Sequence, residues 1–243
     1  MKVHEQLGYS FQPLRVRAYL QTPVISSDKQ LPLDGVLYAL MLRDKLGIDA
    51  RVITKSNDNG VREGQQIYLP LQKSNMREDW WYYKCSFAQF PHHAVEDNES
   101  YTKRFDMHLS DMIDFGKRKA TVDTARGAYK AVHNKLYYTS ALYVDWYCVG
   151  DIDAIRKLLR FATNIGKKTS QGWGAVLRWE VTKWHDDWHL RGPETKPGKR
   201  KLMRAKYHPQ SNVICGMRPS YWLPKHQFPC VIPHPSGDGS VIM

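Results

Sequence analysis

A glycine-rich segment, NIGKKTSQGWG at residues 164–174, constrains the fold of this chain more than any other feature. Apolar residues at helical spacing precede it over 152–163, and a strand-like run follows it over 175–183. Alternation along that run predicts that Leu177 and Val181 lie on the same face. Glycine adopts positive φ and tolerates the close approach of other backbone. The pattern therefore predicts a tight connection that leads from a helix into a strand.

The N-terminal region predicts a strand and then a helix. Residues 14–21 (LRVRAYLQ) alternate strictly, which is typical of a half-buried strand, and Arg15 and Arg17 would lie on its exposed face. After a turn, apolar residues at helical spacing predict a helix over 32–46. Gly47 is positioned to serve as its C-terminal cap.

Composition predicts strands over 67–71 and 80–90, and one long strand over 136–149 that is rich in β-branched and aromatic residues. The polar stretch 91–135 between them predicts an inserted subdomain or a long hairpin. The resulting order of strand, helix, insertion, strand, helix and strand matches a ferredoxin-like, split βαβ layout.

We therefore expect an α+β chain with a ferredoxin-like core over 1–184 that carries a large insertion at about 91–135. Two helices would cover one face of its sheet and leave the other face open, as in RNA-binding proteins of this architecture. A basic, proline-rich extension over 185–243 would follow, with little regular structure.

Positive charge is concentrated between residues 151 and 210, which contain 14 Lys and Arg residues and 6 Asp and Glu residues. The chain has a formal net charge of +12, and residues 191–206 contain seven basic residues and one acidic residue. A local excess of this kind attracts a polyanion, for which nucleic acid is the commonest candidate, although a solvated basic tail is an equal alternative. The residues expected to contact phosphates there are Lys199, Arg200, Lys201 and Arg204.

Several classes of protein are disfavoured. The longest apolar runs fall far short of the roughly 18 residues that a membrane span requires, and the N-terminus lacks the apolar core of a secretory signal. Four scattered cysteines do not form a disulfide framework, so we expect a cytoplasmic protein. A zinc site from His208, Cys215, Cys230 and His234 lacks standard ligand spacing, so we expect neither a metal nor another cofactor.

The glycine-rich segment does not match an ATP-binding loop. Such a loop places its Lys-Ser/Thr pair after its second glycine and opens a helix, whereas here the lysines and hydroxyl residues precede Gly172 and the segment leads into a strand. Backbone N–H groups, two lysines and two hydroxyls would instead converge where a phosphodiester can bind. Trp173 would stack on a base, at about 1–3 kcal/mol, or alternatively fill the core. The residues expected to contact RNA are Gly166, Lys167, Lys168, Thr169, Ser170, Gln171, Gly172, Trp173 and Gly174.

The helix, glycine-rich loop and closing strand together resemble the RAMP superfamily, the RNA-binding Cas proteins of multi-subunit CRISPR effector complexes. The residues that carry this resemblance are Gly166, Lys167, Lys168, Ser170, Gln171, Gly172, Trp173 and Gly174. The segment 13–40 is similar to the opening of the Cas-five-like subunit of type IV systems. The resemblance covers about 14–47 and 136–184, which is under half of the chain.

This resemblance implies a non-catalytic subunit that binds crRNA and grips the 5′ handle of the guide. Its protein partners would be the large-subunit homologue and the backbone subunits, and it would meet target nucleic acid through the assembled complex. The insertion at 91–135 would correspond to the thumb-like excursion that such subunits direct at neighbouring protein and RNA.

The alternative is the sister class of RAMP endoribonucleases, the Cas-six-like enzymes that process precursor crRNA. These enzymes commonly use a histidine near the first helix as general acid or base, and residues 13–47 contain none. His92, His93 and His133 belong to no recognisable motif, so we assign no catalytic residue and favour a protein that is not an enzyme. A generic RNA-binding module or a structural ribonucleoprotein subunit is a further alternative.

Overall fold

The computed structural model is a mixed α+β fold in which antiparallel strands predominate. It describes residues 8–26, 31–46, 67–74, 81–114, 122–185, 191–196, 199–202, 206–207, 209–221, 223–233 and 241–242. Over these residues, no helix combines the length and the apolar character that crossing a membrane requires.

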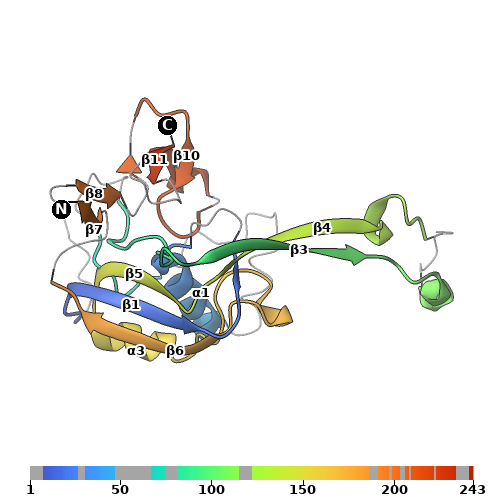
Figure 1. Ribbon diagram of the computed structural model, residues 1–243, viewed down its shortest axis with the longest axis horizontal. Coiled ribbons are helices and arrows are strands. Elements are labelled where there is room, and N and C mark those ends of the chain that lie inside the picture. Colours follow the sequence, from blue (N-terminus) through green and yellow to red (C-terminus); the bar gives the residue numbers. More distant parts are fainter. Residues whose placement is uncertain are drawn as a thin grey trace.

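The main sheet has three antiparallel strands in the order β5-β1-β6 (Figure 1). They are β1 (Gln12–Leu20), β5 (Tyr143–Gly150) and β6 (Val176–Lys183). The alternation predicted for the first strand is confirmed, because Leu14, Val16 and Ala18 are completely buried. Arg15 and Arg17 lie on the opposite face, as expected.

Two helices, α1 (Leu33–Leu46) and α3 (Ile152–Leu159), pack against the buried face of β1. Burial of each aliphatic side chain in this core contributes about 1.5–3 kcal/mol. Asp151 caps α3 by accepting hydrogen bonds from the backbone N–H groups of Asp153 and Ala154, at 3.1 and 2.9 Å. The predicted helix over 152–163 is too long. After Leu159 the backbone N–H groups of Phe161 and Ala162 donate to carbonyl groups three residues earlier, so the α-helical hydrogen-bond pattern ends there.

The predicted strands over 67–71 and 80–90 are wrong as regular strands in the described parts of these ranges. Residues 81–90 run beside β5 but make only isolated bridges, Cys85 to Cys148 and Gln89 to Asp145. The ladder breaks because the hydroxyl of Ser86 takes the place of a backbone acceptor and receives the N–H of Tyr147 at 3.0 Å.

The predicted single strand over 136–149 is in fact two strands. The first, β4 (Val132–Ser140), pairs with β3 (Val95–Lys103) and β2 (Val24–Ile25), and the chain then turns at Leu142 to enter β5. The physical reason is that the first part of the range pairs with β2 and β3 and the second part pairs with β1, and local composition does not reveal strand pairing.

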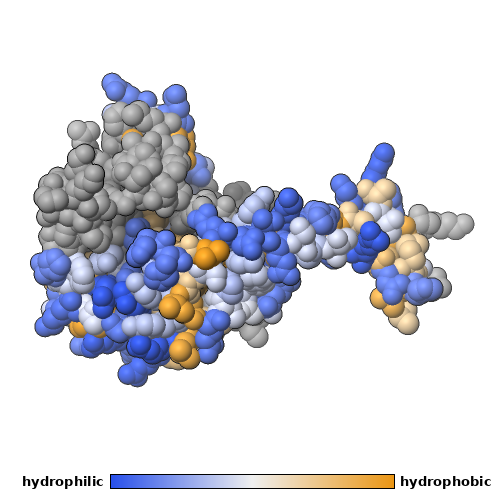
Figure 2. All heavy atoms as spheres, viewed as in Figure 1, coloured by the Kyte–Doolittle hydropathy of each residue, from blue (hydrophilic) through white to orange (hydrophobic). Residues whose placement is uncertain are grey.

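Strands β3 and β4 form a long hairpin that projects from the core, so the hairpin alternative for the insertion at 91–135 is confirmed (Figure 1). The 3-10 turns η2 (Met107–Met112) and η3 (Gly127–Tyr129) lie at its far end. Figure 2 shows polar surface along the stem and apolar surface gathered at the tip. The exposed apolar side chains there include Met107, Leu109 and Met112.

The expected position of Leu177 is wrong. The register of β6 shifts between Tyr19, which is opposite Arg178, and Leu20, which is opposite Val176. Leu177 is the extra residue of this β-bulge and is 61% exposed, whereas Val181 is buried as expected.

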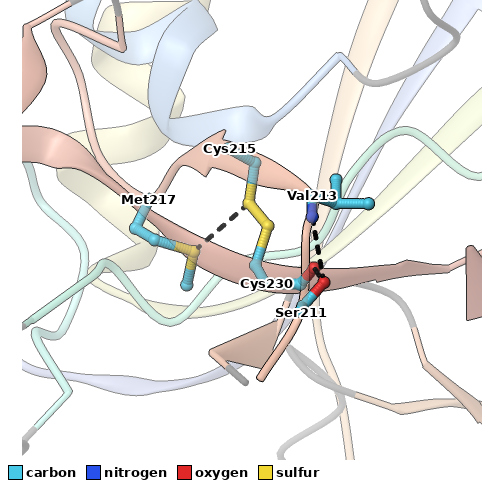
Figure 3. The surroundings of a disulfide bond; sticks show 5 residues. All are labelled: Ser211, Val213, Cys215, Met217 and Cys230. Carbon is cyan, nitrogen blue, oxygen red and sulfur yellow. Dashed lines mark hydrogen bonds between the residues drawn. A yellow bond between two sulfur atoms is a disulfide. The ribbon is translucent and has the colours of Figure 1, made fainter. Parts of the chain in front are cut away.

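The expectation of little regular structure after residue 185 is also wrong. The described strands are β7 (Arg191–Lys196), β8 (Lys199–Leu202), β9 (Lys206–Tyr207), β10 (Ile214–Gly216), β11 (Gln227–Pro233) and β12 (Val241–Ile242), and the 3-10 turn η5 (Pro224–His226) precedes β11. A disulfide joins Cys215 to Cys230 across β10 and β11, with Met217 alongside (Figure 3). It accounts for both cysteines of the disfavoured zinc site.

Candidate nucleic-acid interface

The glycine-rich loop has an unusual backbone that its glycines make possible. Gly166, Gly172 and Gly174 have positive φ of +81°, +88° and +65°, and Lys168 has a φ of +58°. A Cβ atom on Gly166 would come within 2.5 Å of the carbonyl oxygen of Ile25, and one on Gly174 would overlap the backbone of Ile165. Both glycines are therefore required for the loop to pack against the core.

Backbone hydrogen bonds fasten the loop to the segment between β1 and β2. The N–H of Lys167 donates to Ile25 O at 2.8 Å, and the N–H of Gly174 donates to Pro23 O at 2.8 Å. The hydroxyl of Thr22 donates to Gly172 O at 2.7 Å and accepts from the N–H of Ala175 at 2.8 Å. The loop is therefore preorganised at both ends.

The side chains between these anchors face outward. Lys167, Lys168, Ser170 and Gln171 are exposed, and Thr169 is partly exposed at the start of the 3-10 turn η4 (Thr169–Gln171). Within the described chain, neither lysine forms an ion pair with a carboxylate. The structure thus brings the predicted phosphate-binding groups together on one accessible loop.

Two tyrosines of the hairpin, which sequence reasoning missed, meet this loop. The ammonium of Lys168 donates to the hydroxyl of Tyr101 on β3 at 3.4 Å and lies 5.4 Å from its ring centroid. Hydrogen bonds from Asn134 and then Lys168 lower the pKa of the Tyr101 phenol. The available signal was a tyrosine in the predicted insertion and another in the predicted strand over 136–149, but nothing in the sequence showed that either would face the loop.

Trp173 packs against the second of these tyrosines. Its ring centroid lies 5.2 Å from that of Tyr138 on β4, and its side chain is partly exposed. Trp173 therefore neither fills the main core nor stands alone in solvent. One side of its ring system is supported by Tyr138, an arrangement that suits stacking with a base.

The predicted contacts from the open sheet face are occupied within the protein. Arg15 forms an ion pair with Glu180 at 2.9 Å, and Arg17 donates two hydrogen bonds of 2.7 Å to Asp145. The hydrogen bonds to Asp145 hold the pKa of Arg17 above its usual value. Both arginines therefore have a carboxylate counter-ion, whereas the loop lysines have none among the described residues.

Three of the four C-terminal candidates lie on a strand of the C-terminal region. Lys199, Arg200 and Lys201 belong to β8, which pairs with β7, and Arg204 lies outside the described residues. The structure does not bring any of these residues to the glycine-rich loop within the part that it describes.

Histidines do not gather near the loop in the described chain. The rings of His92 and His93 meet edge to face with their centroids 5.4 Å apart, and His93 contacts Tyr143 on β5. His133 lies out on the hairpin, with its Nδ1 3.1 Å from the hydroxyl of Thr102. The described residues contain no group of three or more side chains arranged to bind a metal ion.

Comparison with known families supports the CRISPR assignment. A search of curated proteins finds no match to the chain. The sequence model of one family, described as CRISPR type IV associated protein Csf3, matches residues 12–233. That range includes the main sheet, the hairpin, the glycine-rich loop and most of the C-terminal region. The chain therefore belongs to the Csf3 family of CRISPR type IV associated proteins.

Proposed function

We propose that this type IV CRISPR-associated protein is a non-catalytic subunit that binds crRNA in a multi-subunit effector complex. In this role it holds the 5′ handle of the guide through the glycine-rich loop. The large-subunit homologue and the backbone subunits are its protein partners, and target nucleic acid reaches it through the assembled complex.

The proposal includes a ferredoxin-like RAMP core over 1–184 and a basic extension over 185–243. Its support is the order of the strands in the main sheet. When residues 85–89 are included beside β5, the spatial order is 85–89, β5, β1 and β6, and each neighbouring pair is antiparallel. Helix α1 connects β1 to the region of 85–89, and α3 connects β5 to β6. This order is that of the split βαβ arrangement.

The observation that carries the RNA-binding proposal is the unpaired charge on a preorganised loop. Lys167 and Lys168 are exposed, lack carboxylate partners within the described residues, and stand beside two exposed polar side chains. Trp173 and Tyr101 provide aromatic surface at the same place. Cations and rings together suit a single strand, whose phosphates need neutralisation and whose bases need stacking.

Protein docking is supported by the hairpin. Its tip exposes Met107, Leu109 and Met112, with exposed fractions of 54%, 47% and 81%. Apolar side chains held at the end of a polar stem are typical of a surface that a neighbouring protein covers. The hairpin therefore suits contact with an adjacent subunit.

The test removes the two loop lysines. In Lys167→Ala/Lys168→Ala, guide RNA binding should weaken, and the slope of log affinity against log salt should fall by about 1.4 for two lost phosphate contacts. Lys168→Gly in place of Lys168→Ala removes the charge while suiting the positive φ. The matched control is Lys157→Ala/Lys183→Ala, which removes two exposed lysines from α3 and β6. An unchanged slope in the loop variant would exclude the loop from the RNA surface.

A second candidate function, processing of precursor crRNA, is favoured by one observation. The lowered pKa of Tyr101 beside Lys168 provides a phenol that can act as a general base without a metal. Co-expression with a precursor crRNA and sequencing of the retained RNA ends separates the two functions. A cut at one repeat position that requires the protein and is lost in Tyr101→Phe supports the endoribonuclease. Retained RNA with a protected 5′ handle and no such cut supports the non-catalytic subunit.

A further inference from the structure

One face of the β3–β4 stem lies against the glycine-rich loop (Figure 1). Side chains two positions apart on a strand share a face, so Asp97, Glu99 and Tyr101 of β3 lie on this face together. Tyr138 of β4 is on the same face, because it is the cross-strand partner of Asp97. The loop contacts this row at Tyr138 and at Tyr101. Glu99 therefore lies between the two contacts.

The Tyr101 end of this face offers donors to an anion. The phenol oxygen of Tyr101 accepts hydrogen bonds from Nδ2 of Asn134 at 3.3 Å and from Nζ of Lys168 at 3.4 Å. These two hydrogen bonds lower the pKa of the phenol, which makes its O–H a stronger donor. Within the described residues that O–H donates to no acceptor. An acidic O–H beside an ammonium group suits a phosphate oxygen.

The Tyr138 end of the same face is negative. Partial desolvation first, and then the carboxylates of Asp97 and Glu99, raise the pKa of the Tyr138 phenol. Both oxygens of Asp97 are engaged, because Oδ2 accepts from the hydroxyl of Tyr138 at 3.3 Å and Oδ1 accepts from the N–H of Asn98 at 2.7 Å. Glu99 is exposed and forms no ion pair in the described part of the chain. Glu99 is therefore the carboxylate of this face that can accept hydrogen bonds from a ligand.

Aromatic surface adjoins this carboxylate. The ring of Trp173 lies 5.2 Å from that of Tyr138, and both side chains are partly exposed. The electrostatic effect of Glu99 on Tyr138 places the carboxylate near this pair of rings. Along the strand, Glu99 is two residues, or about 7 Å, from Tyr101. A phosphate site, a carboxylate and a stacking surface thus occur within the span of one nucleotide.

We propose that Glu99 makes the loop selective for a guanosine in single-stranded RNA, an inference that rests on the proposed RNA-binding role of the loop. The phosphate binds at Lys168 and Tyr101. The base stacks on Trp173 and directs its Watson–Crick edge at Glu99.

The choice of guanine follows from the chemistry of a carboxylate, which only accepts hydrogen bonds. Guanine carries two adjacent donors on its Watson–Crick edge, N1–H and the N2 amino group, and these match the two oxygens of one carboxylate. Cytosine and adenine each offer one amino donor beside an acceptor nitrogen. The single N–H of uracil lies between two carbonyl oxygens, which a carboxylate repels.

Binding of short oligonucleotides to the full chain, measured by fluorescence anisotropy, tests this proposal. The probes are UUGU, UUAU, UUCU, UUUU and UUIU, in which inosine (I) lacks only the N2 amino group of guanosine. UUGU should bind about tenfold more tightly than UUAU, UUCU and UUUU, as expected for one bidentate contact with a base edge. UUIU should lose most of this advantage.

Two variants assign the preference to one side chain. Glu99→Gln keeps the shape of the side chain but removes its charge and one acceptor oxygen. It should weaken binding of UUGU and strengthen binding of UUUU, because a negative charge near the phosphates is lost. A general electrostatic effect would strengthen both. Glu96→Gln is the matched control, since Glu96 is an exposed carboxylate on the opposite face of the same strand and its loss should preserve the preference.

Failure of this inference is distinguishable from failure of the proposed role of the loop. Equal binding of all five probes, a preference for another base, or a guanosine preference that persists in Glu99→Gln would overturn the inference alone. Lys167→Ala/Lys168→Ala should weaken binding of every probe. If that variant binds all probes as the native chain does, or if the native chain binds none of them, both proposals are wrong.

Discussion

The guanidinium of Arg17 on β1 holds the carboxylate of Asp145 on β5 through two hydrogen bonds, from its Nε and from one terminal nitrogen, each 2.7 Å long. The ring of Tyr143 lies 3.8 Å from the guanidinium carbon. Asp145 is 7% exposed, so this pair is largely shielded from water. The open face of the sheet is therefore stabilised by its own charges, and RNA would have to compete with Asp145 for Arg17.

Replacement of Asp145 tests the strength of this pair. Asp145→Asn leaves a partly buried guanidinium without its counter-charge, which should lower the free energy of unfolding by about 2–3 kcal/mol. Urea denaturation measures the change. Asp153→Asn is the control, because Asp153 and Arg156 form an exposed pair at 3.8 Å that should contribute little. Equal effects of the two variants would contradict the prediction.

Glycine positions in the loop should differ in their tolerance of a side chain. Gly172→Ala should cost about 1–2 kcal/mol, because a Cβ there meets nothing within 4 Å and only the φ of +88° is unfavourable. Gly174→Ala should cost more, since its Cβ would also overlap Ile165. Denaturation of both variants gives the comparison. Equal stability would mean that the loop does not pack against Ile165.

Stability should fall under mildly acidic conditions because of His226. Its pKa in the folded protein lies below the ordinary value of 6.5, so the unfolded chain binds a proton first as the pH falls. His226 therefore has no effect on the free energy of unfolding well above pH 6.5. Below pH 6.5 it lowers the free energy of unfolding increasingly, and the effect levels off once the pH falls below the pKa of His226 in the folded protein. Denaturation midpoints of the native chain and His226→Gln from pH 7.5 to 5 provide the measurement. The variant should show a shallower loss, and parallel curves would contradict this assignment.

Reduction of the disulfide should loosen the C-terminal strands. Cys215 and Cys230 are 15 residues apart, and a cross-link closing a loop of that length contributes about 3 kcal/mol in the chain-entropy account. Cys215→Ser/Cys230→Ser should therefore melt at a lower temperature than the oxidised protein and should not respond to dithiothreitol. Identical melting of the native chain with and without reductant would show that the disulfide does not stabilise the fold.

Local patterns predicted much of the main core. Alternation identified the buried residues of β1, helical spacing located α1, and the glycines identified the loop whose residues resemble CRISPR-associated proteins. The family match over 12–233 confirms the type IV association. Each of these features depends on residues that are close in sequence, where periodicity and backbone preference act directly.

Long-range pairing decided the features that were missed. The bulge at Leu177 depends on how β6 aligns with β1, and the division between β4 and β5 depends on each strand having a different partner. The contact of Tyr101 with Lys168 joins residues 67 positions apart. Such contacts leave no periodic signal in the sequence of either partner.

The sequence by itself determined that this chain has a glycine-rich loop between a helix and a strand, two lysines on that loop and an excess of positive charge. Only the tertiary structure decided which cations remain available. Strand pairing neutralises Arg17 with Asp145 across the sheet, whereas the loop holds Lys167 and Lys168 away from the described carboxylates. The physical reason is that the sequence specifies which residues are charged, whereas the pairing of distant segments determines which of them lie beside a counter-ion.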